Sequence, residues 1–138
     1  MTNSFVNHPR MPSPRVRPTE LELRILNVLW EHGPASVRDV QRILDAAKPT
    51  GYTTVLKMLQ IMTEKGLVER DETVRPQIYR SAASQQQTQR QLVRDLLLRA
   101  YGGSVKALVM QALGTTKTSA KTLQEIEKLL DREEGGGK

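Results

Sequence analysis

Four side chains near the start of one predicted helix could contact the edges of DNA bases. Tyr52, Thr53 and Thr54 are consecutive, and Lys57 follows one helical turn later. Threonine hydroxyls can donate or accept hydrogen bonds at base edges, threonine methyl groups can contact the thymine methyl, and a lysine can reach a guanine acceptor or a phosphate. Each residue alone is equally consistent with a helix cap or a solvated surface residue. The cluster as a whole favours contact with DNA.

Basic side chains around this cluster are further candidates for contact with phosphates or the minor groove. Each of these basic residues is at least as well interpreted as a solvated surface charge without a specific role, since exposed charges usually contribute little to stability. Residues 18–80 carry nine basic and nine acidic side chains, so a basic surface requires the fold to separate the two signs. The six candidates are Arg38, Lys48, Lys65, Arg70, Arg75 and Arg80, of which the predicted DNA-binding set includes Arg38, Lys48, Arg75 and Arg80 together with the helix cluster.

The composition excludes several other kinds of chemistry. The chain of 138 residues has a formal charge of +6 and no cysteine, so disulfides, thiolate metal sites and cysteine nucleophiles are ruled out. His8 and His32 are the only histidines and stand at no metal-ligand spacing. There is no apolar run long enough for a membrane helix and no secretory signal. We therefore expect a cytoplasmic protein that is not an enzyme, without cofactor, metal or membrane insertion.

Caps and apolar periodicity predict a winged helix-turn-helix over residues 18–80. Thr19 and Glu22 form a capping-box pattern at the start of the first helix, and Gly33 ends it. A second helix starts at Ser36, and a third follows Gly51 and ends at 65–66. Two short apolar-containing runs, 67–70 and 77–80, then predict a β-hairpin wing around 71–76.

The remaining ordered chain, 84–131, reads as three amphipathic helices. Ser84, Ser104 and Ser119 are their predicted caps, Gly102–Gly103 breaks the first from the second, and Gly114 ends the second. Three such helices have too little interior to bury all their leucines, so pairing with a second copy is favoured over packing on the winged helix. The predicted dimerisation residues are Leu92, Leu96, Tyr101, Leu108, Val109, Leu113 and Ile126.

These elements define the expected architecture. The fold class is mainly α, with a winged helix-turn-helix of three helices plus a β-hairpin wing, followed by a three-helix dimerisation domain. The expected domains are a disordered basic arm at 1–17, a winged-helix DNA-binding domain at 18–80, a helical dimerisation domain at 84–131 and a flexible tail at 132–138. The arm is interpreted as a passive tail rather than a phosphate-binding segment.

The motifs together resemble the penicillinase-repressor family of bacterial transcription regulators. The likeness spans about residues 18–131, with helix length and apolar pattern carrying most of its second half. It implies a winged-helix domain, a three-helix dimerisation domain and repression by occupancy of a palindromic promoter operator on double-stranded DNA. The motifs are Thr19-Glu20-Leu21-Glu22, Val37-Arg38-Asp39-Val40, Tyr52-Thr53-Thr54-Val55 and Lys65-Gly66-Leu67-Val68.

The resemblance also implies a way in which repression ends. Family members are commonly released when a membrane sensor protease system triggers cleavage in the dimerisation domain, at an Asn–Phe bond in the best-known members. The matching position here is Gln111-Ala112, a departure that argues against β-lactam-triggered proteolysis. Related copper-responsive repressors carry a cysteine motif, and its absence here disfavours copper sensing.

Two classes of function follow from the sequence. The first is a dimeric repressor that binds a specific operator, which predicts a base preference and an affinity that falls steeply with salt. The alternative is a winged-helix protein-interaction adaptor without specific operator binding, which the near-neutral charge of 18–80 permits. Charge reversal at Lys57 separates the two, because only the repressor should be sensitive to it.

Overall fold

The computed structural model describes residues 17–136, which divide into two compact units at a point of the sequence that lies within one helix. The first unit extends to Leu92 and the second begins at Val93. The boundary therefore falls later than the expected break at 81–83. The reason is packing, because Thr88 is buried and Leu92 approaches Leu26 of the winged helix. Of the predicted arm, residues 1–16 lie outside the described part of the chain.

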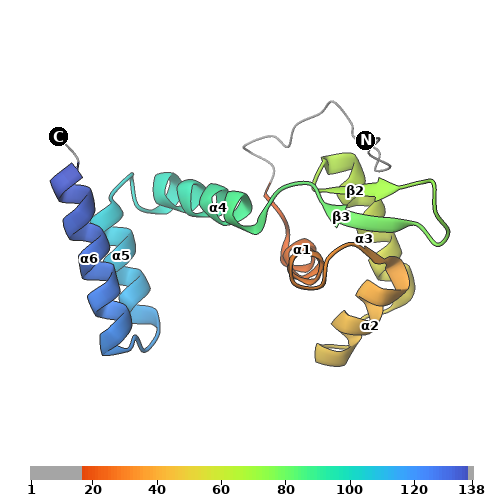
Figure 1. Ribbon diagram of the computed structural model, residues 1–138, viewed down its shortest axis with the longest axis horizontal. Coiled ribbons are helices and arrows are strands. Elements are labelled where there is room, and N and C mark those ends of the chain that lie inside the picture. The colour runs from red at the N-terminus through yellow and green to blue at the C-terminus, as the bar shows by residue number, and fades with distance from the viewer. Residues whose placement is uncertain (1–16, 137–138) are drawn as a thin grey trace. The chain divides into compact units, whose positions relative to one another are not determined.

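The first unit is a winged helix, as predicted. Figure 1 shows three helices beside a small sheet, with the β2–β3 hairpin as the wing. The sheet order is β1-β3-β2 and all pairing is antiparallel. The short strand β1 was not predicted; it pairs Ala35 with Tyr79 and Ser36 with Ile78. The elements are α1 Glu20–His32, β1 Ala35–Ser36, α2 Val37–Ala47, α3 Tyr52–Lys65, β2 Val68–Asp71 and β3 Ile78–Ser81.

The predicted caps set the ends of the helices. The Thr19 side chain accepts from the Glu22 backbone N–H at 3.2 Å, and the Thr19 backbone N–H donates to the Glu22 carboxylate at 2.8 Å. Ser36 accepts from the Asp39 backbone N–H and caps α2. Gly66 ends α3 with φ of 81°, a left-handed conformation that glycine adopts without steric cost.

The core of the first unit lies where the three helices meet the sheet. Ile25 of α1, Val40 of α2 and Leu59 of α3 are fully buried in it. Trp30 is half-buried against this core, and its indole N–H donates to the Ser81 hydroxyl and the Ala83 carbonyl. These contacts attach the end of α1 to the chain that leaves β3. A small domain of this kind needs most of its apolar helix faces buried to be stable.

The carboxylate of Glu22 is the most deeply buried of the first unit, where Asp71 is also buried. The Glu22 side chain is fully buried, and its two oxygens accept from Lys65 Nζ at 3.1 and 2.9 Å. Burial of a charge is costly unless the charge is paired and hydrogen-bonded, and the Glu22 carboxylate meets both conditions. The pair connects the first turn of α1 to the last residue of α3.

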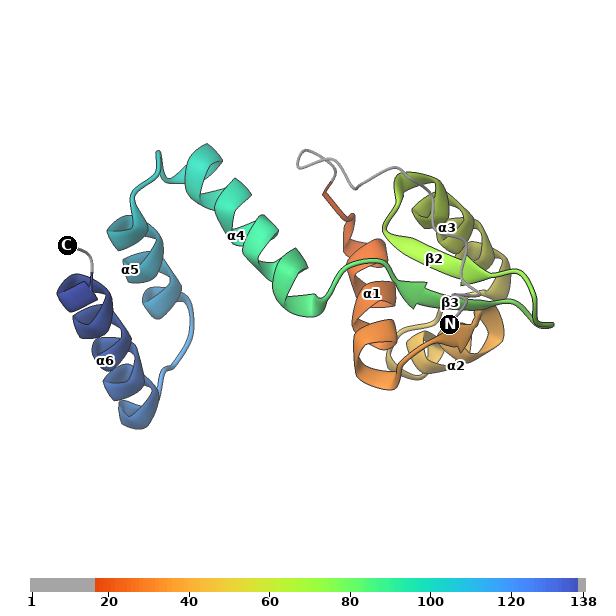
Figure 2. The same ribbon diagram turned by 45° about the horizontal axis from the view of Figure 1, so that its top comes forward.

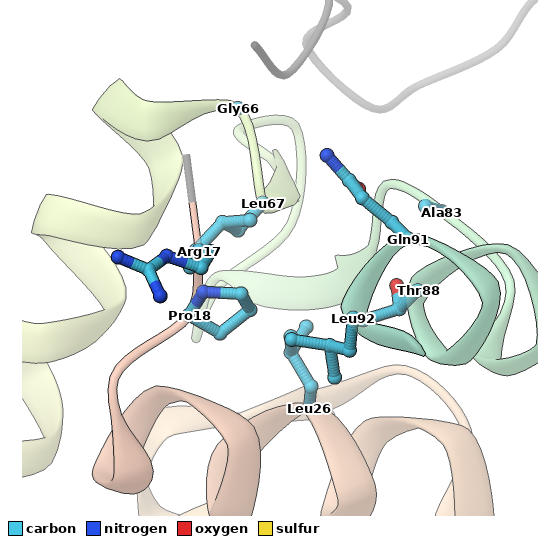
Figure 3. A pocket seen from close by; sticks show the side chains of 9 residues that line it. All are labelled: Arg17, Pro18, Leu26, Gly66, Leu67, Ala83, Thr88, Gln91 and Leu92. Carbon is cyan, nitrogen blue, oxygen red and sulfur yellow. The ribbon is translucent and has the colours of Figure 1, made fainter. Parts of the chain in front are cut away.

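A small hollow lies between the start of α1, the start of β2 and the first turns of α4 (Gln85–Ala100) (Figure 3). Its volume of about 30 Å³ is enough for a water molecule but far below that of a typical small-molecule site. Figure 3 shows the side chains of Leu92 and Leu26 pointing toward one another across it. Leu92 therefore contributes to the first unit.

The second unit consists of the end of α4, α5 (Val105–Thr115) and α6 (Ala120–Gly136). Figures 1 and 2 show α5 and α6 side by side. The caps Ser104 and Ser119 are confirmed, and the second of the predicted helices ends one residue beyond Gly114. The last helix α6 continues to Gly136, into the range 132–138 that was predicted as a tail. Arg132 and Glu133 are good helix formers and extend the helix.

The second unit has no interior of its own within the described residues. From 93 to 133 every side chain is either half-buried or exposed. Many of the exposed side chains are large and apolar, which is unusual for a surface in water. These are Val93, Leu96, Leu98, Val105, Met110, Leu123, Leu129 and Leu130.

Candidate nucleic-acid interface

The first turn of α3, and Lys57 one turn later, present the predicted cluster to solvent. Tyr52, Thr53, Thr54 and Lys57 are all exposed. The N-cap residue is Gly51, and no side chain makes a cap hydrogen bond there. Thr53 and Thr54 therefore lie inside the first turn rather than before it, and the alternative in which they cap the helix does not hold. Their hydroxyl and methyl groups are available for contact with bases.

A cation from α2 lies over the aromatic ring of this turn. The Arg38 guanidinium carbon is 5.5 Å from the centroid of the Tyr52 ring, within the range of a cation–π interaction. At an exposed site such a contact is worth about 0.5–1 kcal/mol, so it orients the Arg38 side chain more than it stabilises the fold. The contact joins two predicted DNA-binding residues, one from each helix of the helix-turn-helix.

Several cations of the helix-turn-helix carry charges that no acidic side chain neutralises. Within residues 17–136, Arg38, Lys48 and Lys57 form no ion pair, and all three are exposed. Arg42 shares these properties and is absent from the set predicted from the sequence. The signal was present, since Arg42 stands four residues after Arg38 and so lies on the same face of α2.

Acidic side chains of the first unit are largely engaged elsewhere. Glu22 is buried against Lys65, and Glu69 pairs with Arg80 at 2.9 Å. Asp45 accepts from the Thr50 backbone N–H. Further along, Glu72 pairs with Arg70, and Asp71 accepts from the Thr73 backbone N–H. These ion pairs leave the sum of charges over 18–80 unchanged, but they determine which cations are compensated by a carboxylate and which are not.

The three arginines of the wing lie in different environments. Arg70 and Arg80 are each held by a carboxylate, so neither offers an uncompensated charge. Arg75 lies in the β2–β3 connection, where its Nη1 donates to the carbonyls of Glu72 and Val74. The guanidinium of Arg75 has five N–H donors, so these two bonds leave donors available at the exposed tip. Arg75 is the wing residue best placed for a phosphate or minor groove.

The predicted dimerisation residues fall into two groups. Leu92 lines the hollow of the first unit. The others belong to the second unit, where Leu96 is exposed and the rest are half-buried, namely Tyr101, Leu108, Val109, Leu113 and Ile126. The candidate cleavage residues Gln111 and Ala112 are exposed in the middle of α5.

The described part of the chain offers neither a metal site nor a membrane helix. No cluster of three or more histidine or acidic side chains that could hold a metal ion occurs between 17 and 136. None of the helices in that range combines the length and apolarity needed to cross a lipid bilayer.

Comparison with known proteins gives the same family as the motifs. The model of the family described as penicillinase repressor matches residues 18–132, which include the winged helix and the second unit as far as the last turn of α6. No curated protein matches the chain. The family is one of transcriptional repressors, which act by binding DNA and are normally not enzymes. Because the match covers the winged helix and most of the helical second unit, the chain belongs to the penicillinase repressor family.

Proposed function

We propose that this protein is a dimeric repressor that occupies an inverted-repeat operator in a promoter. The observation that carries the proposal is the arrangement of side chains on the first two turns of α3. There, Tyr52, Thr53, Thr54 and Lys57 are exposed and engaged in no cap, beside the unpaired cations of α2. A helix of this kind fits the major groove, with its N-terminal residues at the base edges.

The contacts divide into those that position the protein and those that specify sequence. Arg42 and Lys48 are exposed cations on α2 and at its end, and in the proposed complex they bind phosphates. Thr53 and Thr54 contact base edges, and Lys57 reaches a guanine or a phosphate. Arg75 brings a charge from the wing to the adjacent backbone or minor groove.

Dimerisation is supported by the second unit. Its large apolar side chains remain exposed in the single chain, and a second copy would bury them. A twofold dimer presents two copies of α3 to half-sites about one helical turn, ~34 Å, apart. It also doubles the number of phosphate contacts.

Release by proteolysis is compatible with the same proposal. A cut between Gln111 and Ala112 would detach the end of α5 and the whole of α6. The detached part carries Leu129 and Leu130, so the cut removes apolar surface from the proposed dimer. A membrane sensor protease system could act through this position without any contact with DNA.

Selection of genomic fragments by the purified protein tests the proposal. At near-physiological salt, sequencing of the bound fragments should recover a short inverted repeat above the nonspecific background. Recovery of no such repeat would favour the adaptor alternative, in which the winged helix docks on another protein.

Substitutions in α3 should separate base contacts from phosphate contacts. Thr54→Ala should relax the base preference at one half-site position and leave the salt dependence of binding unchanged, since a hydroxyl carries no charge. Lys57→Ala should cost about 1–3 kcal/mol of operator binding if the lysine contacts a guanine. Asn27→Ala, at an exposed neutral position on α1, is the control. Wild-type affinity and preference in both α3 variants would exclude α3 as the base-contacting helix.

The two wing arginines should differ in their effect. Arg75→Ala should lower the slope of log affinity against log salt by about one unit, because one phosphate contact disappears. Arg80→Ala should change the slope less, since Glu69 already neutralises that charge in the free protein. Binding measured over a range of salt concentrations checks both. A larger change for Arg80→Ala than for Arg75→Ala would contradict the assignment.

A further inference from the structure

We propose that Gln41 and Asp45 of α2 are positioning residues that fix where α3 begins, and that they thereby set the base preference of the protein. Neither side chain belongs to the predicted DNA-contacting set. The inference rests on the proposed function, since it concerns the placement of the groups that contact bases.

The two side chains hold both backbone groups of the same residue. Gln41 Nε2 donates to the Thr50 carbonyl at 2.9 Å, and Asp45 Oδ1 accepts from the Thr50 N–H at 2.9 Å. Gln41 and Asp45 are four residues apart on α2, so they lie on one face of that helix. The Thr50 hydroxyl in turn donates to the Lys48 carbonyl at 2.7 Å, which closes the turn between the helices.

Thr50 is the residue before the N-cap of α3, so its position determines that of the first turn. Because the N-cap is Gly51 and makes no side-chain cap bond, α3 has no cap of its own to fix its start. A side chain at 51 would meet no steric obstacle, since φ is −82° and no atom outside the adjacent chain lies within 4 Å of the place that a Cβ would take. The start of α3 is thus fixed from α2 and remains open toward solvent.

The opposite end of α3 is held independently. Lys65, its last residue, is paired with the buried carboxylate of Glu22 on α1. Loss of the Thr50 contacts should therefore leave the C-terminal end of α3 in place and free only its first turn. That turn carries Thr53 and Thr54, whose hydrogen bonds to bases require placement within about 0.5 Å. Discrimination between bases should fall more than general affinity for DNA.

Substitutions at Asp45 provide a matched pair. Asp45→Asn removes the charge and keeps a side-chain oxygen that can accept from the Thr50 N–H, whereas Asp45→Ala removes both. The two variants carry the same net charge, so a difference between them reports the hydrogen bond alone. Gln41→Leu removes the donor to the Thr50 carbonyl at similar side-chain size and unchanged charge.

The first measurement compares affinity for the selected operator with affinity for an operator altered at one half-site base pair. We expect Asp45→Ala and Gln41→Leu to lower this ratio about tenfold, the effect of one hydrogen bond of ordinary strength, and Asp45→Asn to stay within about twofold of wild type. The salt slope should be the same for Asp45→Ala and Asp45→Asn. Equal ratios for these two variants would overturn the proposal.

Hydrogen exchange at the Thr50 amide gives a readout that needs no DNA. The amide should exchange faster in Asp45→Ala than in Asp45→Asn, and equal rates would overturn the positioning contact itself. If the wild-type protein binds no DNA sequence in preference to others, the proposed function is contradicted. The exchange rates still test whether Asp45 accepts a hydrogen bond from the Thr50 N–H. If Asp45→Ala does not fold, the operator ratio of Gln41→Leu decides, and a wild-type ratio there would overturn the proposal.

Discussion

Leu129→Asp should convert the proposed dimer to a monomer and abolish high-affinity binding to the proposed operator. Leu129 is 54% exposed in the single chain, so the substitution should leave the fold of each copy intact. Burial of a leucine is worth about 2 kcal/mol, and a twofold interface contains the residue twice. A loss of about 4 kcal/mol raises the dimer dissociation constant about a thousandfold. Sedimentation and operator titration at matched protein concentrations measure the two effects.

Gln124→Asp is the matched control on the same helix, because it places the same carboxylate at an exposed position that is polar already. It should remain dimeric and bind the operator as the wild type does. A Leu129→Asp protein that is monomeric yet binds the operator with undiminished affinity would refute the coupling between dimerisation and DNA binding. A Leu129→Asp protein that stays dimeric would place the interface elsewhere on the second unit.

Lys65→Met should be the most destabilising single change in the first unit that removes no apolar packing. The substitution removes the cationic partner of the fully buried Glu22 carboxylate. The hydrogen bond from the Thr19 N–H to this carboxylate remains. Loss of one partner from a buried ion pair costs about 3–5 kcal/mol. Because the Lys65 side chain is 34% exposed, solvent screens part of the interaction and we expect about 2–3 kcal/mol. Thermal unfolding should shift down by roughly 10–20 °C.

Two further variants identify the cause of this loss. Lys57→Met removes an exposed lysine from the same helix and should change stability by less than about 0.5 kcal/mol. The double variant Glu22→Gln with Lys65→Met should recover part of the stability, since no unpaired charge then remains inside. An unchanged unfolding temperature for Lys65→Met would show that the buried carboxylate does not depend on this lysine.

Local rules in the sequence were enough to predict most of the fold. Thr19, Ser36 and Ser104 cap helices because a side-chain oxygen satisfies a backbone N–H within three residues. Gly66 ends α3 because its left-handed conformation is available to glycine in any context. These interactions involve residues close together in the sequence, so they can be predicted without knowledge of the tertiary structure. The exposed cluster from Tyr52 to Lys57 followed from the same apolar periodicity of α3.

Contacts between distant segments were decided by the tertiary structure alone. Glu22 looked like an ordinary capping residue, and its partner Lys65 lies 43 positions away. In the sequence Arg80 has no acidic neighbour, but the pairing of β2 with β3 places Glu69 beside it. The strand β1 is too short to leave a periodic signal, and it exists because β3 offers an edge for it.

The roles of single residues likewise fall into those predictable from the sequence and those that depend on the folded structure. The winged helix with an exposed polar turn and the leucine-rich second part are predictable from the sequence, because periodicity and caps are properties of neighbouring residues. The folded structure was needed to show that Leu92 faces Leu26, that Arg42 is an unpaired cation, and that Gln41 and Asp45 hold Thr50. Each of these depends on which side chains meet in space, and composition and spacing do not specify that.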